Sequence, residues 1–253
     1  MRNEALVGYL LHQRPYQEKR ALYSLFSREC GVIHGVGKKG APLFEALQLF
    51  ATGKKELKTF SQITLAPQAY DVTSEKLPSY AQIQGQQQYA ALYLNEILWK
   101  LLPLEDPMPV LWQHYQNSLL MLKQPLTTQQ LRLCLRQFEQ QLIAELGFAI
   151  TLEHDHNLVV ISPDHRYRFL PEVGLILVSS SDSLLIKQAT IEPPAIAQTI
   201  LTGRELIAMA ELGITEVTLS AWSRLNRLLL DHLLEYQPLQ SRLLWQQQQR
   251  YQS

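Results

Sequence analysis

Basic residues next to aromatic residues are the part of this sequence best suited to chemistry with an anionic partner. In one strand-like run, strict alternation places Lys58 and Phe60 on one face and Leu57, Ile63 and Leu65 on the other. If the aliphatic face fills a core, the lysine can contact a phosphate and the neighbouring ring can stack on a base. Stacking of this kind contributes roughly 1–3 kcal/mol per base to binding. The alternative is that the ring packs against the rest of the protein and the lysine is merely solvated.

Further basic residues lie within the first 60 positions, close to an aromatic residue or to glycines through which a backbone can approach a ligand. Taken singly, each is more typical of a solvated surface charge. Together they predict a phosphate track whose affinity falls as salt rises. With Lys58 and Phe60, the candidate DNA contacts are Arg14, Tyr16, Lys19, Arg20, Lys38, Lys39, Lys54 and Lys55.

A second constellation lies in a helical pattern further along the chain. Arg132 and Arg136 are four residues apart, beside the apolar Leu131 and Leu135. Basic residues that border an apolar groove suit a short acidic peptide ending in a hydrophobic residue. The competing interpretation is that Arg136 forms an ion pair with nearby Glu139 and that the leucines belong to the core.

One group of residues has the chemistry of a metal site. It consists of His154, Asp155, His156, Asp164 and His165. Imidazoles and carboxylates bind divalent ions, but a Pro-Asp turn separates the last histidine from the others, so a polar hairpin tip is the favoured interpretation. The sequence has neither a phosphate-binding loop nor a Gly-x-Ser-x-Gly nucleophile elbow. We therefore predict no catalytic residues, no metal and no cofactor, with a metal-dependent hydrolase as an alternative.

Composition restricts the class of protein. The chain has 253 residues, 46% of them hydrophobic and 18% charged, with zero net charge, which is typical of a folded globular protein. Residues 1–80 contain 11 Lys/Arg and 7 Asp/Glu, whereas residues 81–253 contain 12 and 16. The basic excess weakly favours an anionic partner for the first third. Two cysteines, no signal-peptide pattern and no apolar run near roughly 18 residues predict a cytoplasmic protein without a membrane partner.

The elements that must position these residues are β-strands in the first 65 positions. Glycine and proline separate short apolar runs at about ten-residue intervals, a pattern typical of a small barrel. The clearest expected strands are Glu4–His12, Lys19–Arg28, Val32–Lys38 and Lys55–Leu65. A turn is expected at residues 13–16. Five strands in this length predict an OB-fold, whose exposed face commonly binds single strands.

After a polar connection at 66–85, the apolar spacing becomes helical. The expected helices cover residues 86–102, a segment that begins near Pro109, 127–147, a region after Pro194 broken at Gly203 and Gly213, and a last segment after Pro238. Strand-like sequence at 149–161 and 167–179 predicts two inserted hairpins. The overall prediction is an α+β protein, with an OB-fold domain and linker over 1–80 and a helical domain over 81–253 that carries a β insertion at about 149–180.

Four blocks in chain order resemble a known family. They are RPYQE and LFSRECG (14–18, 25–31), LQLF and ELKT (47–50, 56–59), YLNEIL and LPLEDP (93–98, 102–107), and the run 131–148 with its ELGF ending. A weaker echo is PLQSR at 238–242. This pattern is similar to RecO, a family of bacterial recombination mediators. Two departures stand out: the basic run after Lys38 is shorter than in many members, and the cysteines with which some members bind zinc at about 150–185 are absent.

The resemblance implies an N-terminal OB-fold followed by a helical domain. It also implies binding of single- and double-stranded DNA, annealing of complementary strands without ATP, and a cytoplasmic, nucleoid-associated protein. The implied partners are the acidic C-terminal tail of the single-stranded-DNA-binding protein, RecR and, indirectly, RecA. In that case Arg132 and Arg136 contact the carboxylates of the tail, and Leu131 and Leu135 lie near its terminal aromatic residue. The alternative is an adaptor whose OB-like barrel binds protein and not DNA.

Overall fold

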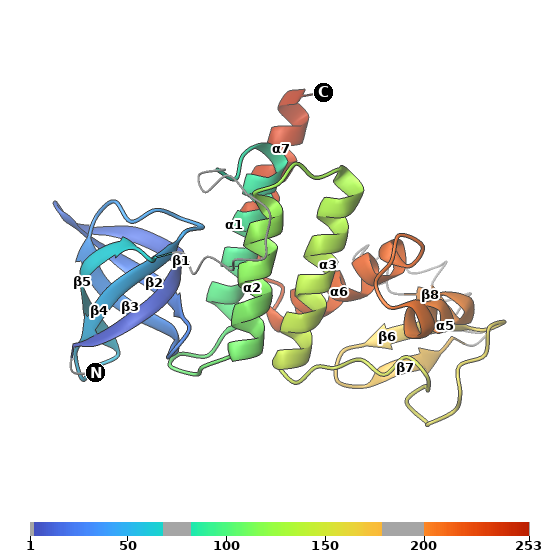
Figure 1. Cartoon of the computed structure of the whole chain (residues 1–253). Helices are drawn as coiled ribbons and strands as arrows, with labels where there is room; N and C mark the ends of the chain where they lie inside the picture. Colours follow the sequence, from blue (N-terminus) through green and yellow to red (C-terminus); the bar gives the residue numbers. More distant parts are fainter. Residues whose placement is uncertain (1–2, 68–81, 179–199, 253) are drawn as a thin grey trace. The chain divides into compact units, whose positions relative to one another are not determined.

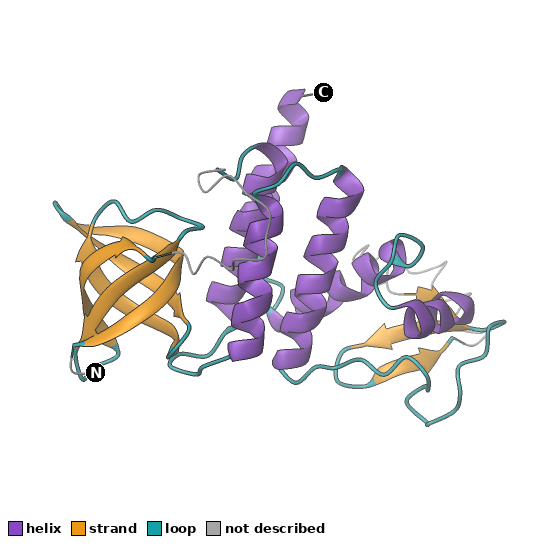
Figure 2. Ribbon diagram, in the orientation of Figure 1, coloured by secondary structure: helices purple, strands orange, loops and turns teal. Residues whose placement is uncertain are grey.

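The computed structural model describes residues 3–67, 82–178 and 200–252. The chain divides into two compact units, one of Met1–Leu126 with Pro238–Ser253 and one of Thr127–Gln237. The first contains a β-barrel and three helices, and the second contains helices and a small sheet (Figure 1, Figure 2). The boundary that the sequence predicts near residue 80 falls among residues 68–81, outside the described residues, and stays a prediction.

The first unit begins with the predicted five-stranded barrel. Its strands are β1 (Glu4–Gln17), β2 (Arg20–Ser27), β3 (Gly31–Lys38), β4 (Ala46–Thr52) and β5 (Leu57–Leu65). The closed order is β1-β2-β3-β5-β4, in which only the β3–β5 pair is parallel. This confirms the OB-fold prediction. Alternating apolar residues fill the barrel, because successive side chains of a strand point to opposite faces; they include Leu6, Leu10, Tyr23, Leu25, Ile33, Leu47 and Leu49.

Strand β1 extends further than the sequence predicts. The expected turn at residues 13–16 is instead strand, because β2 pairs with it as far as Gln17 opposite Arg20. The pairing shifts register between Leu10 and His12 and again between Pro15 and Gln17. Beyond Tyr9, β1 pairs with β2 alone. An edge position beside a register irregularity tolerates proline, so Pro15 does not end the strand.

The predicted facing of β5 is wrong. Phe60 is 3% exposed within the barrel core, and Lys58 is 4% exposed, whereas Leu57 and Leu65 are 47% and 63% exposed. A bulge is one reason: residues 62 and 63 stand between the Ser61–Phe50 and Thr64–Gln48 pairs, opposite a single residue of β4. The bulge breaks strict alternation, so Ile63 packs against the same core as Phe60.

Glycines of β3 make the space for the Phe60 ring. A Cβ added at Gly35 would lie 2.5 Å from that ring, and one added at Gly37 would lie 2.7 Å from the Cδ1 atom of Ile63. A larger residue at Gly35 would therefore compete with Phe60 for one volume. The two glycines determine which face of β5 turns inward.

Two helices follow the barrel in the first unit, α1 (Gly85–Leu101) and α2 (Pro109–Leu122), both as predicted. The buried amide of Asn95 on α1 ties this helix to the barrel. Its Nδ2 donates to the carbonyl oxygens of Leu10 at 3.0 Å and Leu11 at 3.3 Å, and its Oδ1 accepts from the Tyr115 hydroxyl at 2.5 Å. Buried polar groups must be hydrogen-bonded, so this single amide joins β1, α1 and α2.

The C-terminal helix α7 (Gln240–Gln252) also belongs to the first unit and packs on α1. Glu96 interrupts the apolar stripe of α1, and its buried carboxylate accepts the N–H groups of Gln240 at 2.9 Å and Ser241 at 2.8 Å. The first N–H groups of a helix have no partner within the helix and attract negative charge. Glu96 therefore caps the start of α7.

The second unit contains α3 (Thr128–Glu145), α5 (Gly203–Leu212), α6 (Leu219–Leu233) and a sheet in the order β7-β6-β8. Its strands are β6 (Arg166–Leu170), β7 (Gly174–Leu177) and β8 (Ile200–Thr202). Of the two predicted hairpins, the second is present as β6 and β7, while 149–161 forms a short turn without assigned strands, closed by the bridge His154–Val160 and by the hydrogen bond from Ile161 N–H to the carbonyl oxygen of Glu153 at 3.0 Å. Gly203 begins α5, where the sequence predicts a helix break. None of the described helices is both long and apolar enough to cross a bilayer.

Candidate nucleic-acid interface

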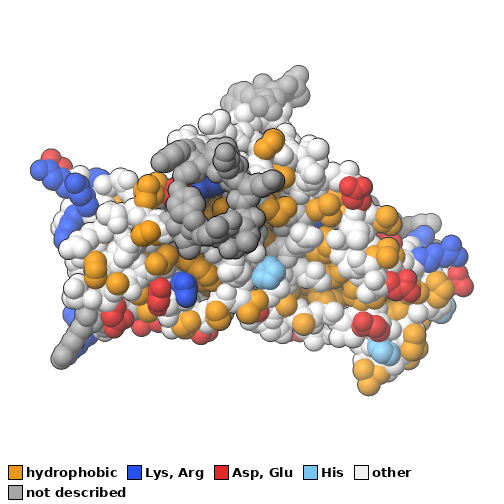
Figure 3. All heavy atoms as spheres, viewed as in Figure 1, with side chains coloured by type: hydrophobic (Ala, Val, Ile, Leu, Met, Phe, Trp, Pro, Cys, Tyr) orange, Lys and Arg blue, Asp and Glu red, His pale blue; other side chains and the backbone are white. Residues whose placement is uncertain are grey.

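Register brings four of the predicted basic residues together where β1 turns into β2. Arg20 pairs directly with Lys38 of β3. The N–H of Lys39 donates to the carbonyl oxygen of Lys19 at 3.1 Å, and its Nζ donates to the carbonyl oxygen of Glu18 at 2.8 Å. Lys and Arg side chains gather over this end of the barrel in the space-filling view (Figure 3). The residues that follow β3 therefore meet the β1–β2 turn.

Arg14 belongs to the same surface. It pairs with Leu22 of β2, two residues along from Arg20, so the two basic side chains face the same side of the sheet. That side is outward, because the intervening Ala21 and the following Tyr23 lie in the barrel core. We call Arg14, Lys19, Arg20, Lys38 and Lys39 the hairpin cluster. All five are exposed.

The charges of the hairpin cluster are available to a ligand. Among the residues that the structure describes, none of the five forms an ion pair within 4.0 Å. Tyr16 lies beside them at the second register shift of β1 and is 53% exposed. The cluster thus combines unneutralised positive charge with one exposed aromatic ring, which are the two features that single-strand-binding surfaces share.

Lys54 and Lys55 are exposed but lie elsewhere on the barrel. They occupy the connection between β4 and β5, and β4 reaches that connection beside the start of β1, where Ala51 pairs with Glu4. The hairpin cluster lies at the other end of β1, so the two lysines form a separate basic site.

Two residues of the predicted interface, Lys58 and Phe60, are buried in the structure. The Nζ of Lys58 lies 2.6 Å from Oε1 of Glu105 and donates to the carbonyl oxygen of Lys55 at 2.7 Å. Its charge is therefore neutralised and buried. The Phe60 ring lies inside the barrel, where no base can stack on it. Sequence reasoning also passed over His12, although alternation from Arg14 places it on the same outward face.

The predicted peptide-binding residues of α3 have different environments. Arg132 is exposed, and the described residues offer it no ion pair within 4.0 Å, while Leu131 is only 8% exposed and Leu135 is half-buried. Arg136 Nη2 donates to Oε1 of the buried Glu139 at 2.5 Å. The contacts of Arg136 are therefore those of the alternative interpretation, in which it forms an ion pair with Glu139.

The same buried carboxylate joins α3 to α6. Asn226 Nδ2 donates to Oε2 of Glu139 at 3.2 Å and to the carbonyl oxygen of Arg136 at 3.3 Å. A buried carboxylate is stable only when it is paired and hydrogen-bonded. Arg136 and Asn226 supply these contacts, so their first role is to hold the second unit together.

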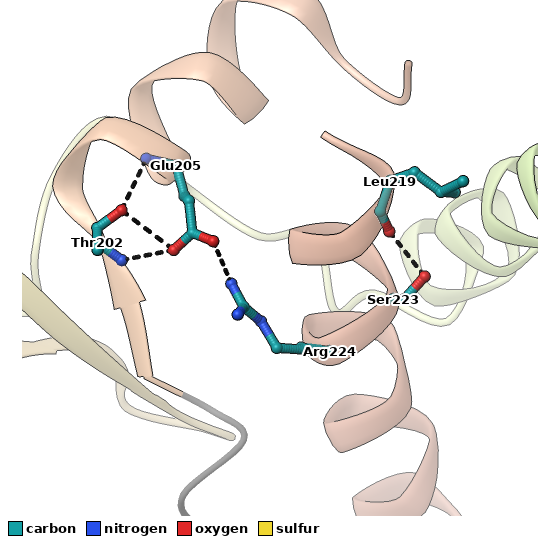
Figure 4. A network of polar contacts seen from close by, with 5 residues as sticks. All are labelled: Thr202, Glu205, Leu219, Ser223 and Arg224. Atoms are coloured by element: carbon teal, nitrogen blue, oxygen red, sulfur yellow. Dashed lines mark hydrogen bonds and ion pairs between the residues drawn. The ribbon is translucent and has the colours of Figure 1, made fainter. Parts of the chain in front are cut away.

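A second ion pair of this unit joins α5 to α6. Glu205 hydrogen-bonds Thr202 in a reciprocal cap and accepts from Arg224 Nη2, while the Ser223 hydroxyl donates to the carbonyl oxygen of Leu219 (Figure 4). Burial raises the pKa of Glu205, but the hydrogen bonds from Thr202 and Arg224 outweigh this, and the pKa lies below its ordinary value. The network is structural and lies apart from the predicted sites.

The histidine and aspartate group forms a turn. Asp155 Oδ1 accepts the N–H groups of Asn157 at 2.8 Å and Val159 at 2.9 Å, so this carboxylate organises its own loop. His154, His156 and His165 are exposed. Across the described ranges, no three His, Cys, Asp or Glu side chains converge as the ligands of a metal would. The arrangement fits the polar hairpin tip better than it fits a hydrolase centre.

Comparison with known proteins places the chain among relatives of similar length. A family model described as "Recombination protein O C terminal" matches residues 84–243. A protein of Pseudomonas aeruginosa named "DNA repair protein RecO" is 34% identical over 249 residues, which cover 95% of this chain and 94% of that protein.

Two further proteins carry the same name. One from Stutzerimonas stutzeri is 33% identical over 94% of this chain and 92% of its own length. One from Coxiella burnetii is 29% identical over 94% of this chain and 95% of its own length. Identity of this extent spans the barrel as well as the helical region. The chain belongs to the RecO family.

Proposed function

We propose that this protein acts in DNA repair and recombination as a mediator that binds single- and double-stranded DNA. The observation that carries the proposal is the hairpin cluster, where register gathers five exposed basic side chains without ion-pair partners in the described part of the chain. The names of the relatives point to DNA repair. A basic barrel end supplies the electrostatic contact that such a role requires.

Annealing of complementary strands follows from the same surface without nucleotide hydrolysis. Two strands repel each other through their phosphates, and basic side chains that displace counterions reduce that repulsion. Strands held on one protein also meet at high local concentration. No catalytic residue is needed for this step, so the proposed function is non-enzymatic.

Recruitment to coated DNA is the second part of the proposal. We infer that α3 binds the acidic tail of the single-stranded-DNA-binding protein through Arg132, with Leu135 beside it. Arg136 and Leu131 contribute less, because the first is paired with Glu139 and the second is buried. Cooperation with RecR to load RecA, in the cytoplasm and on the nucleoid, completes the proposal, which for these partners rests on family membership.

Charge reversal at the hairpin cluster tests DNA binding. The double variant Lys38→Glu, Lys39→Glu should bind a single-stranded oligonucleotide more weakly than the parent protein, because repulsion replaces attraction. The slope of log affinity against log salt should also fall by about 1.4, as expected for the loss of two contacts to a single strand. Fluorescence anisotropy at several salt concentrations measures both quantities.

The matched control is Lys54→Glu, Lys55→Glu, which makes the same charge change at the other end of β1. If both double variants lose affinity equally, binding follows total charge and the hairpin cluster is not the interface. An absence of oligonucleotide binding by the parent protein, even at low salt, would instead favour the protein-binding adaptor.

A further inference from the structure

Two histidines share the outward face on which the hairpin cluster lies. His12 of β1 pairs with Ser24 of β2, and Ser24 pairs with His34 of β3, so the three form one rung across the strands. The Ser24 hydroxyl oxygen lies 3.4 Å from Nδ1 of His34. Because Ser24 is two residues from Leu22, the partner of Arg14, this rung faces the same way as the Arg14 rung.

The basic side chains of this face run from the hairpin cluster to the histidines, with Leu22 half-buried and Val36 and Ser24 buried between them. Successive outward rungs lie about 7 Å apart, so Arg20, Arg14 and His12 span roughly 14 Å. The face ends there, because the side chains of the next rung, Tyr9 and Phe26, lie against Trp112 of α2 with ring centroids 5.1 and 5.4 Å apart. The histidines therefore form the inner limit of the accessible basic surface.

The surroundings of His12 hold its pKa below the ordinary value for histidine. Burial lowers its pKa most, and the Arg14 guanidinium and His34 lower it further, while the Glu96 carboxylate of α1 opposes them. The ring also stacks on Trp99 of α1, with centroids 4.0 Å apart and planes 2° apart. Such an imidazole is poised to gain a proton when an anion approaches, since a nearby opposite charge favours the charged form.

The other charged groups near this rung are already compensated. Lys100 of α1 lies 3.7 Å from Glu96. On β5, Leu57 stands opposite His34, and the neighbouring Lys58 is paired with Glu105. Arg14 stays charged at any physiological pH, so the group left to change its protonation when an anion binds is His12.

We propose that the outward face of β1, β2 and β3 is one continuous site for single-stranded polyphosphate, and that His12 takes up a proton when the strand binds. This rests on the proposed DNA binding and adds its regulation. Proton uptake and ligand binding are reciprocal, so a ligand that raises the pKa of His12 must bind more tightly as the pH falls. The hairpin cluster supplies the part of the attraction for DNA that does not change with pH. The histidine rung supplies the part that depends on pH.

The test is an anisotropy titration of the full chain with an oligothymidylate, from about pH 8 to about pH 5.5 at constant ionic strength. Thymine bases do not titrate in this range, so the pH dependence belongs to the protein. A rise of one unit in the pKa of one histidine gives at most a tenfold gain, reached only below both pKa values, so we expect affinity to increase about fivefold by about pH 5.5. The double variant His12→Gln, His34→Gln should reduce the gain to about twofold or less.

Control measurements separate the rung from general charge effects and from misfolding. His114→Gln, an exposed change on α2, should keep the full pH dependence. His34→Gln alone leaves the His12–Trp99 stack intact and should keep most of the gain. Nuclear magnetic resonance of the imidazole rings should show the pKa of His12 rising when the oligonucleotide binds.

Two results would overturn the proposal in distinguishable ways. Binding that is equally strong at every pH, or a pH dependence that survives in the double histidine variant, removes the histidine rung from the site while leaving DNA binding in place. Absence of binding at every pH removes the proposed function and this inference with it.

Discussion

Ser241 donates two hydrogen bonds to one oxygen of Glu96, through its N–H at 2.8 Å and through its hydroxyl at 2.7 Å. The two residues are 145 positions apart in the chain and both are buried. This contact fixes the start of α7 against the middle of α1. It gives a structural reason for the serine of the PLQSR segment. From the sequence alone, this segment is only a weak resemblance to the family, without a physical explanation.

Removal of the Ser241 hydroxyl should destabilise the first unit. Hydrogen bonds to charged groups contribute about 1.5–3 kcal/mol, so we expect Ser241→Ala to lower the free energy of unfolding by about that amount. Urea unfolding measures the loss, and amide hydrogen exchange should show faster opening of α7. Gln240→Ala is the matched control, since Gln240 bonds Glu96 through its backbone N–H and its exposed side chain is dispensable. Equal losses in the two variants would contradict the role of the hydroxyl.

Gly35→Ala should disturb the barrel core through Phe60. The added methyl group would lie 2.5 Å from the ring, and overpacking of this kind costs about 1–3 kcal/mol. Thermal or urea unfolding measures the cost. In the double variant Gly35→Ala, Phe60→Leu, the smaller side chain should relieve part of the strain. The loss of unfolding free energy in the double variant should therefore be smaller than the sum of the losses in the two single variants. Strict additivity would show that the glycine is not there to accommodate the ring.

The Glu205–Arg224 pair should make the stability of the second unit depend on pH at the acid end. The pKa of Glu205 is lower in the folded chain than its ordinary value, so its contribution is complete above the unfolded pKa of about 4.5 and is lost as the pH falls through the folded pKa. Urea unfolding of Glu205→Gln and the parent protein should therefore differ most near pH 7 and converge in acid. Because both side chains are about one-third exposed, we expect a difference of about 1 kcal/mol or less. A difference that grows on acidification would have the wrong sign.

Arg132→Ala and Arg136→Ala should separate peptide binding from folding. Arg132 is exposed, so its loss should weaken binding of an acidic peptide that ends in an aromatic residue, with little change in stability. Arg136→Ala should instead destabilise the second unit by about 3–5 kcal/mol, because the buried Glu139 would lose its charged partner. Calorimetry with the peptide and urea unfolding of each variant measure the two effects. Unchanged peptide affinity in Arg132→Ala would place the peptide site elsewhere.

Much of the fold is encoded locally and can be predicted from the sequence. Short apolar runs between glycines indicate the barrel, and the helix expected over 127–147 is α3, which starts after Thr127 with a reciprocal capping box. Such signals span a few residues and depend on backbone geometry alone. The order of the family blocks is likewise a property of the chain, and it identified the family without any knowledge of contacts.

The tertiary structure alone decided which basic residues lie together. Lys38 and Arg20 are 18 positions apart, and only the register of β2 with β3 makes them neighbours. Strict alternation also placed Phe60 and Ile63 on opposite faces, whereas the bulge between them and the space above Gly35 let both face the core. Bulges, register and ion pairs depend on partners distant in sequence, so a pattern read along one strand cannot contain them. The sequence determined most of the elements and the family, and packing between strands determined which basic residues share the face proposed to bind DNA.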